Sequence, residues 1–314
     1  MGKFADLFSD RIWSIDTEKE PVGYARLVHL VKVVRITLDT FAENRMGFQC
    51  VALSYFVALA IIPLIAFIFA VSGGLGLESY LDAFLLSFST EVDASLLNLL
   101  SEKAANIIDI AQGGGVGAIS AFAFLWTILW MMFQVERVFN NVWGIRKIPR
   151  KIYKRFGFYF LVLILAPFIV VVFGAGIAYY ANIYKFIGLD VSELRFLPKI
   201  LGYLGFYAIT VFTLSAMFKF IPATKVYYRN ALRAAAISGI VFVIFQYLYL
   251  ETQVFVARLN TVYGVLAAVP LFLIWLNFSW QIIIYGAELT YAFQNVQGYG
   301  LEDMPRRRSK RRKK

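Results

Sequence analysis

Polar side chains recur along one apolar segment near the end of the chain, Asn277 to Phe293. Asn277, Gln281, Tyr285 and Glu288 follow one another at intervals of four, four and three residues. A helix would therefore place them on one face. Amide and carboxyl groups in an apolar helix either bond to neighbouring helices or line a polar cavity. The spacing leaves both interpretations open: helix packing, or a cavity for a polar ligand.

Residues that commonly carry catalysis or bind metals are scarce. The chain has one histidine, His29, and one cysteine, Cys50. Zinc sites take clustered His and Cys ligands, and RNA hydrolysis usually needs metal-binding carboxylates or an acid and a base. The sequence has no nucleotide-binding motif. We therefore expect no enzyme activity, no metal and no cofactor.

The composition indicates the medium that surrounds the protein. Hydrophobic residues make up 60% of the 314 residues, charged residues make up 16%, and the mean hydropathy is +0.67. Soluble domains average about 45–50% apolar and about 25% charged residues. This chain has too little polar surface for a water-soluble fold, so we expect an all-α polytopic membrane protein.

Six apolar segments are long enough to cross a bilayer, which takes about 20 residues. They cover residues 47–73, 110–134, 156–184, 200–218, 234–256 and 262–293. These six transmembrane helices form a predicted domain of residues 46–295. The cytoplasmic N-terminal segment, residues 1–45, precedes it, and a basic tail, residues 296–314, follows it.

The distribution of basic residues predicts the orientation. Of the 31 Lys and Arg residues, 26 lie in the N-terminal segment, the second–third and fourth–fifth connections, and the tail. Cytoplasmic loops carry an excess of Lys and Arg. Both termini are therefore expected in the cytoplasm, and an even number of spans satisfies this.

Amphipathic segments flank the predicted spans. Residues 24–41 carry Arg26, His29, Lys32, Arg35 and Asp39 at steps of three and four, and the remaining face is apolar. This pattern predicts an amphipathic helix that lies on the inner leaflet or packs on the bundle. Similar spacing in the first external loop, residues 78–109, predicts two short amphipathic helices.

The tail contains eight Lys and Arg residues after Pro305 and no apolar residue. We expect it to be disordered. It either lies near anionic inner-leaflet head groups or serves only as a topology signal. No stacking aromatic residues accompany its arginines, so we expect no nucleic-acid partner.

Depth separates the three polar residues of the last span. At about 1.5 Å per residue, Asn277 lies about 21 Å from Tyr263, whereas Glu288 lies about 38 Å along. Glu288 is thus expected at the inner boundary, wet and paired with an arginine, and the two amides are expected to need partners inside the bundle. The candidate partners of Glu288 are Arg137, Arg229 and Arg233, and those of the amides are Gln246, Tyr55 and Ser54.

Prolines lie within three of the predicted spans: Pro63, Pro167 and Pro270. Proline removes a backbone hydrogen bond and kinks a helix. The carbonyl groups that a kink frees need partners, often in a cavity or on a neighbouring helix. The prolines therefore predict kinked spans around an internal cleft.

Motifs in a fixed order resemble the YihY/BrkB family of bacterial inner-membrane proteins. They are CVALSYFVALAIIPLIAF (50–67), ERVFNNVWGI (136–145), FKFIPATKVYYRNALRAAAISG (218–239), YGVLAAVPLFLIWLNFS (263–279) and YGAELTYAF (285–293). The resemblance covers about residues 35–295. The family pattern falls on Tyr55, Pro63, Asn140, Trp143, Pro222, Tyr263, Gly264, Trp275, Gly286, Ala287 and Glu288, none of them an established catalytic position.

The resemblance implies a multi-pass protein of the bacterial inner membrane. Members have been filed as "ribonuclease BN" and as serum-resistance factors, and some are proposed to transport lipids or lipid-linked envelope precursors. We expect a transporter of this kind, with membrane lipids as partners and a polar pocket beside Asn277 and Gln281. The alternative is a structural or assembly protein for the envelope; the sequence leaves the substrate and the oligomeric state open.

Overall fold

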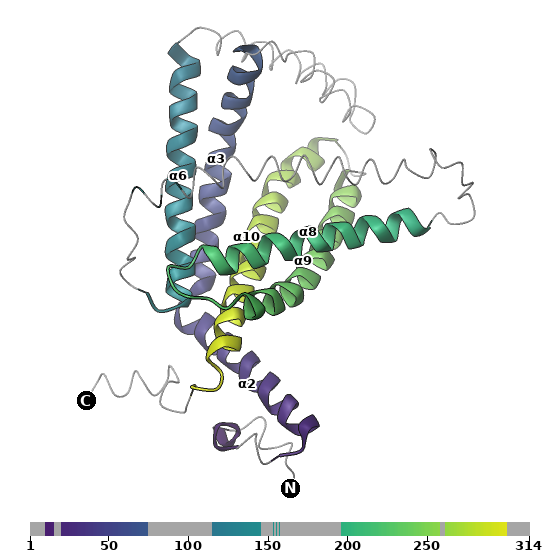
Figure 1. Cartoon of the computed structure of the whole chain (residues 1–314). Coiled ribbons are helices and arrows are strands. Elements are labelled where there is room, and N and C mark those ends of the chain that lie inside the picture. The colour runs from purple at the N-terminus through teal and green to yellow at the C-terminus, as the bar shows by residue number, and fades with distance from the viewer. Residues whose placement is uncertain are drawn as a thin grey trace, which may run out of the picture. The chain divides into compact units, whose positions relative to one another are not determined.

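The computed structural model describes residues 10–15, 20–74, 115–145, 153, 155, 157, 196–257 and 261–299. Within these ranges every regular element is a helix, which agrees with the predicted all-α class. The elements of Figure 1 are the 3-10 helix η1 (Asp10–Ser14) and the α-helices α2 (Val22–Glu43), α3 (Met46–Gly74), α6 (Gly115–Val142), α8 (Phe196–Phe220), α9 (Tyr228–Ala257) and α10 (Thr261–Asn295).

The chain divides into two compact units. The first comprises residues 1–51 and 135–314, and the second comprises residues 52–134. Helices α3 and α6 each contribute residues to both units. All side-chain contacts of the candidate site described below lie within the first unit.

Three helices of the first unit are long and apolar enough to cross a membrane. The qualifying stretches are Tyr203–Phe220 in α8, Tyr228–Gln253 in α9 and Val269–Asn295 in α10. A shorter apolar stretch, Met46–Ala60, lies in α3. The last three predicted spans thus correspond to membrane-capable helices, whereas six spans and cytoplasmic termini remain predictions.

Several predictions fall on residues that the structure does not describe. Outside the described residues lie the amphipathic loop 78–109, the span 156–184 apart from Gly157, Pro167, and the tail after Tyr299. Pro63 lies in α3, and Pro270 lies inside α10 and is exposed. Both helices run continuously through their prolines, and the predicted kinks remain predictions.

Small side chains pack between α8, α9 and α10, while large apolar side chains face outward. Buried residues include Ala234, Ala235 and Ala287, and the exposed ones include Phe212, Ile244 and Phe278. Without a hydrophobic force between helices in lipid, close packing of small residues holds spans together. This distribution suits a helical bundle in a bilayer.

Hydroxyl groups within the helices bond to their own backbone. Thr37, Ser238 and Thr290 each donate to the carbonyl oxygen four residues earlier, at 2.8, 2.8 and 2.9 Å. Such bonds let a hydroxyl lie in an apolar interior without an interhelical partner. These residues therefore allow close helix contact without leaving a hydroxyl group unsatisfied.

Helix α2 packs against the end of α10. Val33 and Ile36 of α2 form a buried cluster with Ala292 and Val296, and the Phe41 ring stacks on Tyr285 at a centroid distance of 3.8 Å. Of the two predictions for this amphipathic helix, packing on the bundle is thus confirmed. A separate apolar stripe of α2 is exposed: Leu27, Leu30, Val34 and Leu38.

Among the glycines of the described residues, Gly286 lies closest to side chains of neighbouring helices. A Cβ atom at this position would lie 2.4 Å from Phe218 Cζ and 2.7 Å from Ser238 Oγ. Phe218 is itself 1% exposed, so its ring has little room to move. Only glycine lets α10 approach α8 and α9 this closely.

We expect Gly286→Ala to destabilise the protein by about 1–3 kcal/mol, because the added methyl group overpacks a filled site. Unfolding of the protein in micelles by a denaturing detergent measures the change. Gly47→Ala is the matched control, since nothing lies within 4 Å of its Cβ position; it should be neutral or stabilising. Equal effects of the two changes would contradict the close approach.

The pKa of His29 is lowered by partial burial and then by the charges of Arg233 and Lys32. Since folding disfavours the protonated imidazole, stability is complete above the unfolded pKa of about 6.5 and falls as the pH drops below it. We expect His29→Gln to lose less stability than the wild type on acidification, measured by thermal unfolding across this range. Identical pH profiles would show that His29 has no such role.

Candidate functional site

The two amides of α10 bond to each other. Gln281 Nε2 donates to Asn277 Oδ1 at 2.6 Å, and both side chains are half-buried. Residues four apart on a helix face one another, so this pair satisfies part of its bonding without a second helix. Partners on other helices, predicted for these amides from the sequence, remain a prediction; the bond between the two lies within α10.

The expected partner Gln246 contacts another residue of α10. Its Oε1 accepts a 2.9 Å hydrogen bond from Trp275 Nε1, and the Trp275 ring stacks on Tyr249. Tyr55 belongs to the second unit, where its ring meets Phe56 at 6.2 Å. Gln246 thus joins α9 to α10 by bonding to the Trp275 indole and not to the amide of Asn277 or Gln281.

Glu288 is fully buried, although the sequence analysis expected it to be wet. Asn44 Nδ2 donates to its Oε1 at 3.4 Å, and Thr40 and Glu43 are its other interacting neighbours. The expected arginines Arg137, Arg229 and Arg233 are exposed, and no arginine of the described ranges pairs with this carboxyl. Its depth along α10 predicted contact with water at the membrane surface, but the end of α2 covers Glu288 there.

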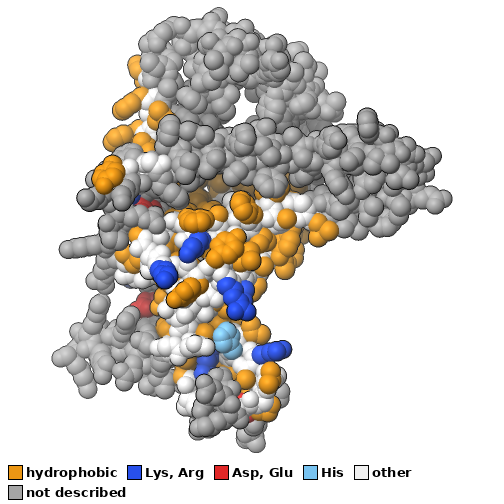
Figure 2. All heavy atoms as spheres, viewed as in Figure 1, with side chains coloured by type: hydrophobic (Ala, Val, Ile, Leu, Met, Phe, Trp, Pro, Cys, Tyr) orange, Lys and Arg blue, Asp and Glu red, His pale blue; other side chains and the backbone are white. Residues whose placement is uncertain are grey.

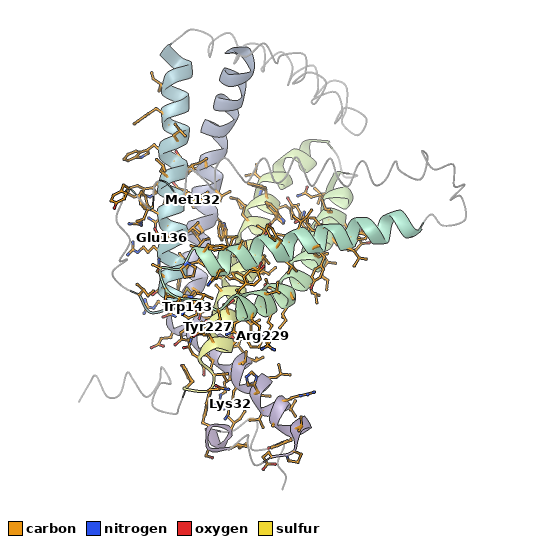
Figure 3. All side chains as sticks on the ribbon, viewed as in Figure 1. Lys32, Met132, Glu136, Trp143, Tyr227 and Arg229 are labelled. Atoms are coloured by element: carbon orange, nitrogen blue, oxygen red, sulfur yellow. The ribbon has the colours of Figure 1, made fainter. Side chains whose placement is uncertain are left out.

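The ion pair of this region involves two other residues. Arg155 Nε donates to Glu136 Oε2 at 2.6 Å, and the Glu136 side chain is 1% exposed. Glu136 lies on α6, one turn before Asn140; Figure 3 shows it on that helix, with Trp143 nearer its end. The two residues are 19 positions apart, so the three- and four-residue spacing of a helix could not predict this pair.

Asn140 joins the end of α6 to the segment between α8 and α9. Its side chain is buried; Oδ1 accepts from the Ala223 backbone N–H at 2.7 Å, and Nδ2 donates to the Glu136 carbonyl oxygen at 2.8 Å. Lys219 donates to the Val226 carbonyl oxygen in the same segment. These bonds fix a non-helical turn that contains Pro222.

Gln294 holds the same segment from the other side. It accepts from the Tyr227 N–H at 2.9 Å and donates to the Lys225 carbonyl oxygen at 3.0 Å. Figure 3 shows Tyr227 and Arg229 at the start of α9. The ends of α6, α8 and α10 and the start of α9 thus form one connected region, which we call the basic end because exposed Lys225, Arg229, Arg233 and Arg137 surround it.

A polar cavity of about 680 Å³ lies at the basic end. Three separate stretches line it, from the ends of α2, α6 and α10. The ring of Trp143 meets that of Tyr291 edge-on at 5.3 Å in its wall. The lining residues are Thr40, Glu43, Asn44, Asn141, Val142, Trp143, Gly144, Tyr291, Gln294, Asn295, Gln297, Gly298 and Tyr299.

The polar lining of this cavity is mostly neutral. Five amide side chains and four aromatic or hydroxyl-bearing side chains accompany Glu43, the one charged residue among the described lining. Amide groups both donate and accept hydrogen bonds. Such a surface suits a ligand rich in hydroxyl groups better than a strongly charged one.

A turn after α6 shapes the cavity wall. Gly144 has φ of 68°, a left-handed conformation that glycine adopts without strain. The Gly144 N–H donates to the Asn141 carbonyl oxygen at 3.0 Å, and the Ile145 N–H donates to that of Asn140 at 2.9 Å. The NNVWG sequence, with its glycine after a helix, was the signal for this turn. Asn140 and Trp143 were predicted only from the family resemblance.

A second, smaller cavity of about 250 Å³ is apolar. Both cavities are lined by residues of α2 and α10. On α2, Thr37 lines the apolar cavity and Thr40, three residues later, lines the polar one; on α10, Leu289 lines the apolar cavity and Tyr291, two residues later, lines the polar one. The other lining residues of the apolar cavity are Ile237, Ser238, Val241, Ile282, Tyr285 and Gly286. Neither cavity includes Asn277 or Gln281.

Comparison with known proteins identifies the family. The family model described as "Virulence factor BrkB" matches residues 37–311. The chain belongs to the BrkB family. No solved structure matches this chain. Within the described ranges, no three His, Cys, Asp or Glu side chains gather as a metal site would require.

Curated relatives carry the name UPF0761 membrane protein. The chain is 27% identical to one from Chromohalobacter salexigens over 76% of its length and 28% identical to one from Aromatoleum aromaticum over 82%. It spans 57% and 62% of those two relatives, so it matches little more than half of their length. A relative from Aggregatibacter aphrophilus is 23% identical, with 82% of this chain and 90% of that protein covered.

The relatives' names and the three membrane-capable helices agree on location. The protein is a multi-pass protein of the bacterial inner membrane, as the resemblance implied.

We expect Arg155→Met to destabilise the protein by about 3–5 kcal/mol, because it leaves the Glu136 charge buried without its guanidinium partner. The double change Glu136→Gln with Arg155→Met should recover most of this loss, since no charge then remains buried. Unfolding in micelles completes the double-mutant cycle. Purely additive losses would show that the pair is not coupled.

Proposed function

We propose that the protein transports an amphiphile, a lipid or lipid-linked envelope precursor, and that the polar cavity receives its head group. The observation that carries this proposal is a polar cavity of about 680 Å³ at one end of three apolar, membrane-capable helices. Cavities of this size bind ligands of some tens of atoms.

The two cavities together match an amphiphile. The polar cavity and the apolar one are both lined by residues of α2 and α10, and Thr37 and Thr40, which line the apolar and the polar cavity, are about one turn apart on α2. A head group in the first would leave the start of an acyl or isoprenoid chain near the second. Soluble metabolites would have no use for the apolar cavity.

The lining favours a hydroxyl-rich head group, such as a sugar. Asn141 and Gln297 face the cavity with amides that bond to no described side chain or backbone group. The Trp143 and Tyr291 rings offer an apolar surface with polar edges. No lysine or arginine is among the described lining, whereas a phosphate site usually uses such residues.

Helix α2 offers a contact with the membrane surface. Its exposed stripe of Leu27, Leu30, Val34 and Leu38 is apolar, and Arg26 beside it is exposed. On the face shown in Figure 2, Lys and Arg side chains gather below an apolar band. This arrangement supports anionic inner-leaflet lipids as partners of the basic end.

The test is transport in liposomes that contain the purified protein and a fluorescent lipid with a sugar head group. We expect Asn141→Leu with Gln297→Leu to slow transport about thirtyfold, because two hydrogen bonds of about 1 kcal/mol each are lost. Asn230→Leu is the matched control, a half-buried amide at the same end that does not line the cavity. It should transport at the wild-type rate.

Two outcomes would contradict the proposal. Unchanged transport by the double variant would remove the cavity from the pathway. Absence of transport by the wild type, together with envelope defects in cells that carry the double variant, would instead favour a structural role for the protein.

A further inference from the structure

Glu288 is the buried titratable group that the proposed transport does not use. Its side chain is fully buried, and its Oε2 has no hydrogen-bond partner within the described part of the protein. The one hydrogen bond to Oε1, from Asn44, is long at 3.4 Å. An ionised carboxylate in such surroundings would be costly, since a buried charge needs a partner or strong donors.

The Thr40 hydroxyl donates its hydrogen to its own helix, which leaves it as an acceptor toward Glu288. Thr40 Oγ donates to the Ile36 carbonyl oxygen at 2.7 Å and lies 3.3 Å from that of Thr37. A hydroxyl group has one hydrogen. While that hydrogen bonds to the Ile36 carbonyl oxygen, only the lone pairs of Thr40 Oγ are left for the adjacent Glu288 carboxyl. A protonated carboxyl group can donate to them, whereas a carboxylate cannot. Turned toward Glu288 instead, the same hydrogen would favour the carboxylate.

The charges around Glu288 act in the same direction. On α2, the Glu43 carboxylate acts on it. Lys219 on α8 is directed to the Val226 carbonyl oxygen, and Arg229 and Arg233 on α9 are exposed. On its own helix, the neighbouring titratable groups are the phenols Tyr285 and Tyr291. Among the described residues, no cation is placed to neutralise a carboxylate here.

We propose that Glu288 is a proton-binding site that controls the polar cavity. The protonated carboxyl group donates to Thr40 Oγ. When the proton leaves to the cavity, the carboxylate needs donors, so the Thr40 hydrogen turns away from Ile36 and the Asn44 amide closes on the carboxylate. Both residues line the cavity, and its shape therefore changes with the proton.

The location of Glu288 fits such a control. It lies on α10 among Tyr285, Gly286 and Leu289, which line the apolar cavity, and three residues before Tyr291, which lines the polar one. Coupling of the proton to passage of a head group rests on the proposed function. The proton site does not, because it depends only on the contacts of Glu288.

Infrared spectra of the purified protein in micelles test the proton site directly. At neutral pH we expect the carbonyl-stretch band of a buried carboxylic acid, which shifts in deuterated water and is lost in Glu288→Gln. Glu136→Gln is the matched control, since it removes a buried glutamate that pairs with Arg155; it should leave this band and lose carboxylate signal.

Two further measurements cover a variant that fails to fold. Thr40→Val removes the acceptor and should move the acid band to higher frequency. The wild type should lose stability as the pH rises above neutral, and Glu288→Gln, a neutral donor of the same size, should not. Absence of an acid band in the wild type, or a band that survives Glu288→Gln, would overturn the proposal whether or not the protein transports lipid.

Discussion

The basic end of this protein depends on one constraint: polar groups shut off from water and lipid must be satisfied by other parts of the chain. Asn140 shows how this works, because its buried amide binds the α8–α9 segment and the backbone of α6 at once. Gln294 binds the same segment from α10, and Arg155 neutralises Glu136. In a low-dielectric surrounding each such bond costs much to break. The bonds therefore hold helix ends from distant parts of the sequence in one arrangement, and the polar cavity is the space left between them.

Close packing of small residues holds the middle of the bundle together, and hydrogen bonds between polar side chains hold the helix ends. Where α8, α9 and α10 meet, Gly286, Ala287 and Ser238 allow backbone contact, and hydroxyl groups bond to their own helices. Toward the ends of the helices, the side chains become amides and aromatic rings, which can bind a ligand as well as each other. Glu288 lies where the two regimes meet.

Helix positions followed closely from the sequence, and the site did not. The predicted span 47–73 corresponds to Met46–Gly74, and 200–218 to Phe196–Phe220, because membrane thickness sets the length of an apolar helix. The periodicity of residues 24–41 likewise indicated α2. The cavity could not be predicted in this way, since Asn44, Asn141 and Asn295 are distant in sequence and meet only through tertiary contacts. Glu288 was expected to be wet because its depth was measured along α10 alone, without the helix that covers it. The amides Asn277 and Gln281 were expected to reach across the bundle, although their spacing of four residues already allowed them to pair.

The central claim is that the cavity at the basic end binds the head group of a lipid. Photo-crosslinking from a photoreactive amino acid at position 297, followed by mass spectrometry of the protein from native membranes, tests it most directly. Gln297 is exposed and lines the cavity, and a photoreactive residue at Ile244, exposed on α9 away from the cavity, serves as the comparison. The account predicts one class of hydroxyl-rich lipid enriched at position 297 over position 244. Adducts at position 297 that match the bulk lipid composition, or no lipid adduct there at all, would contradict it.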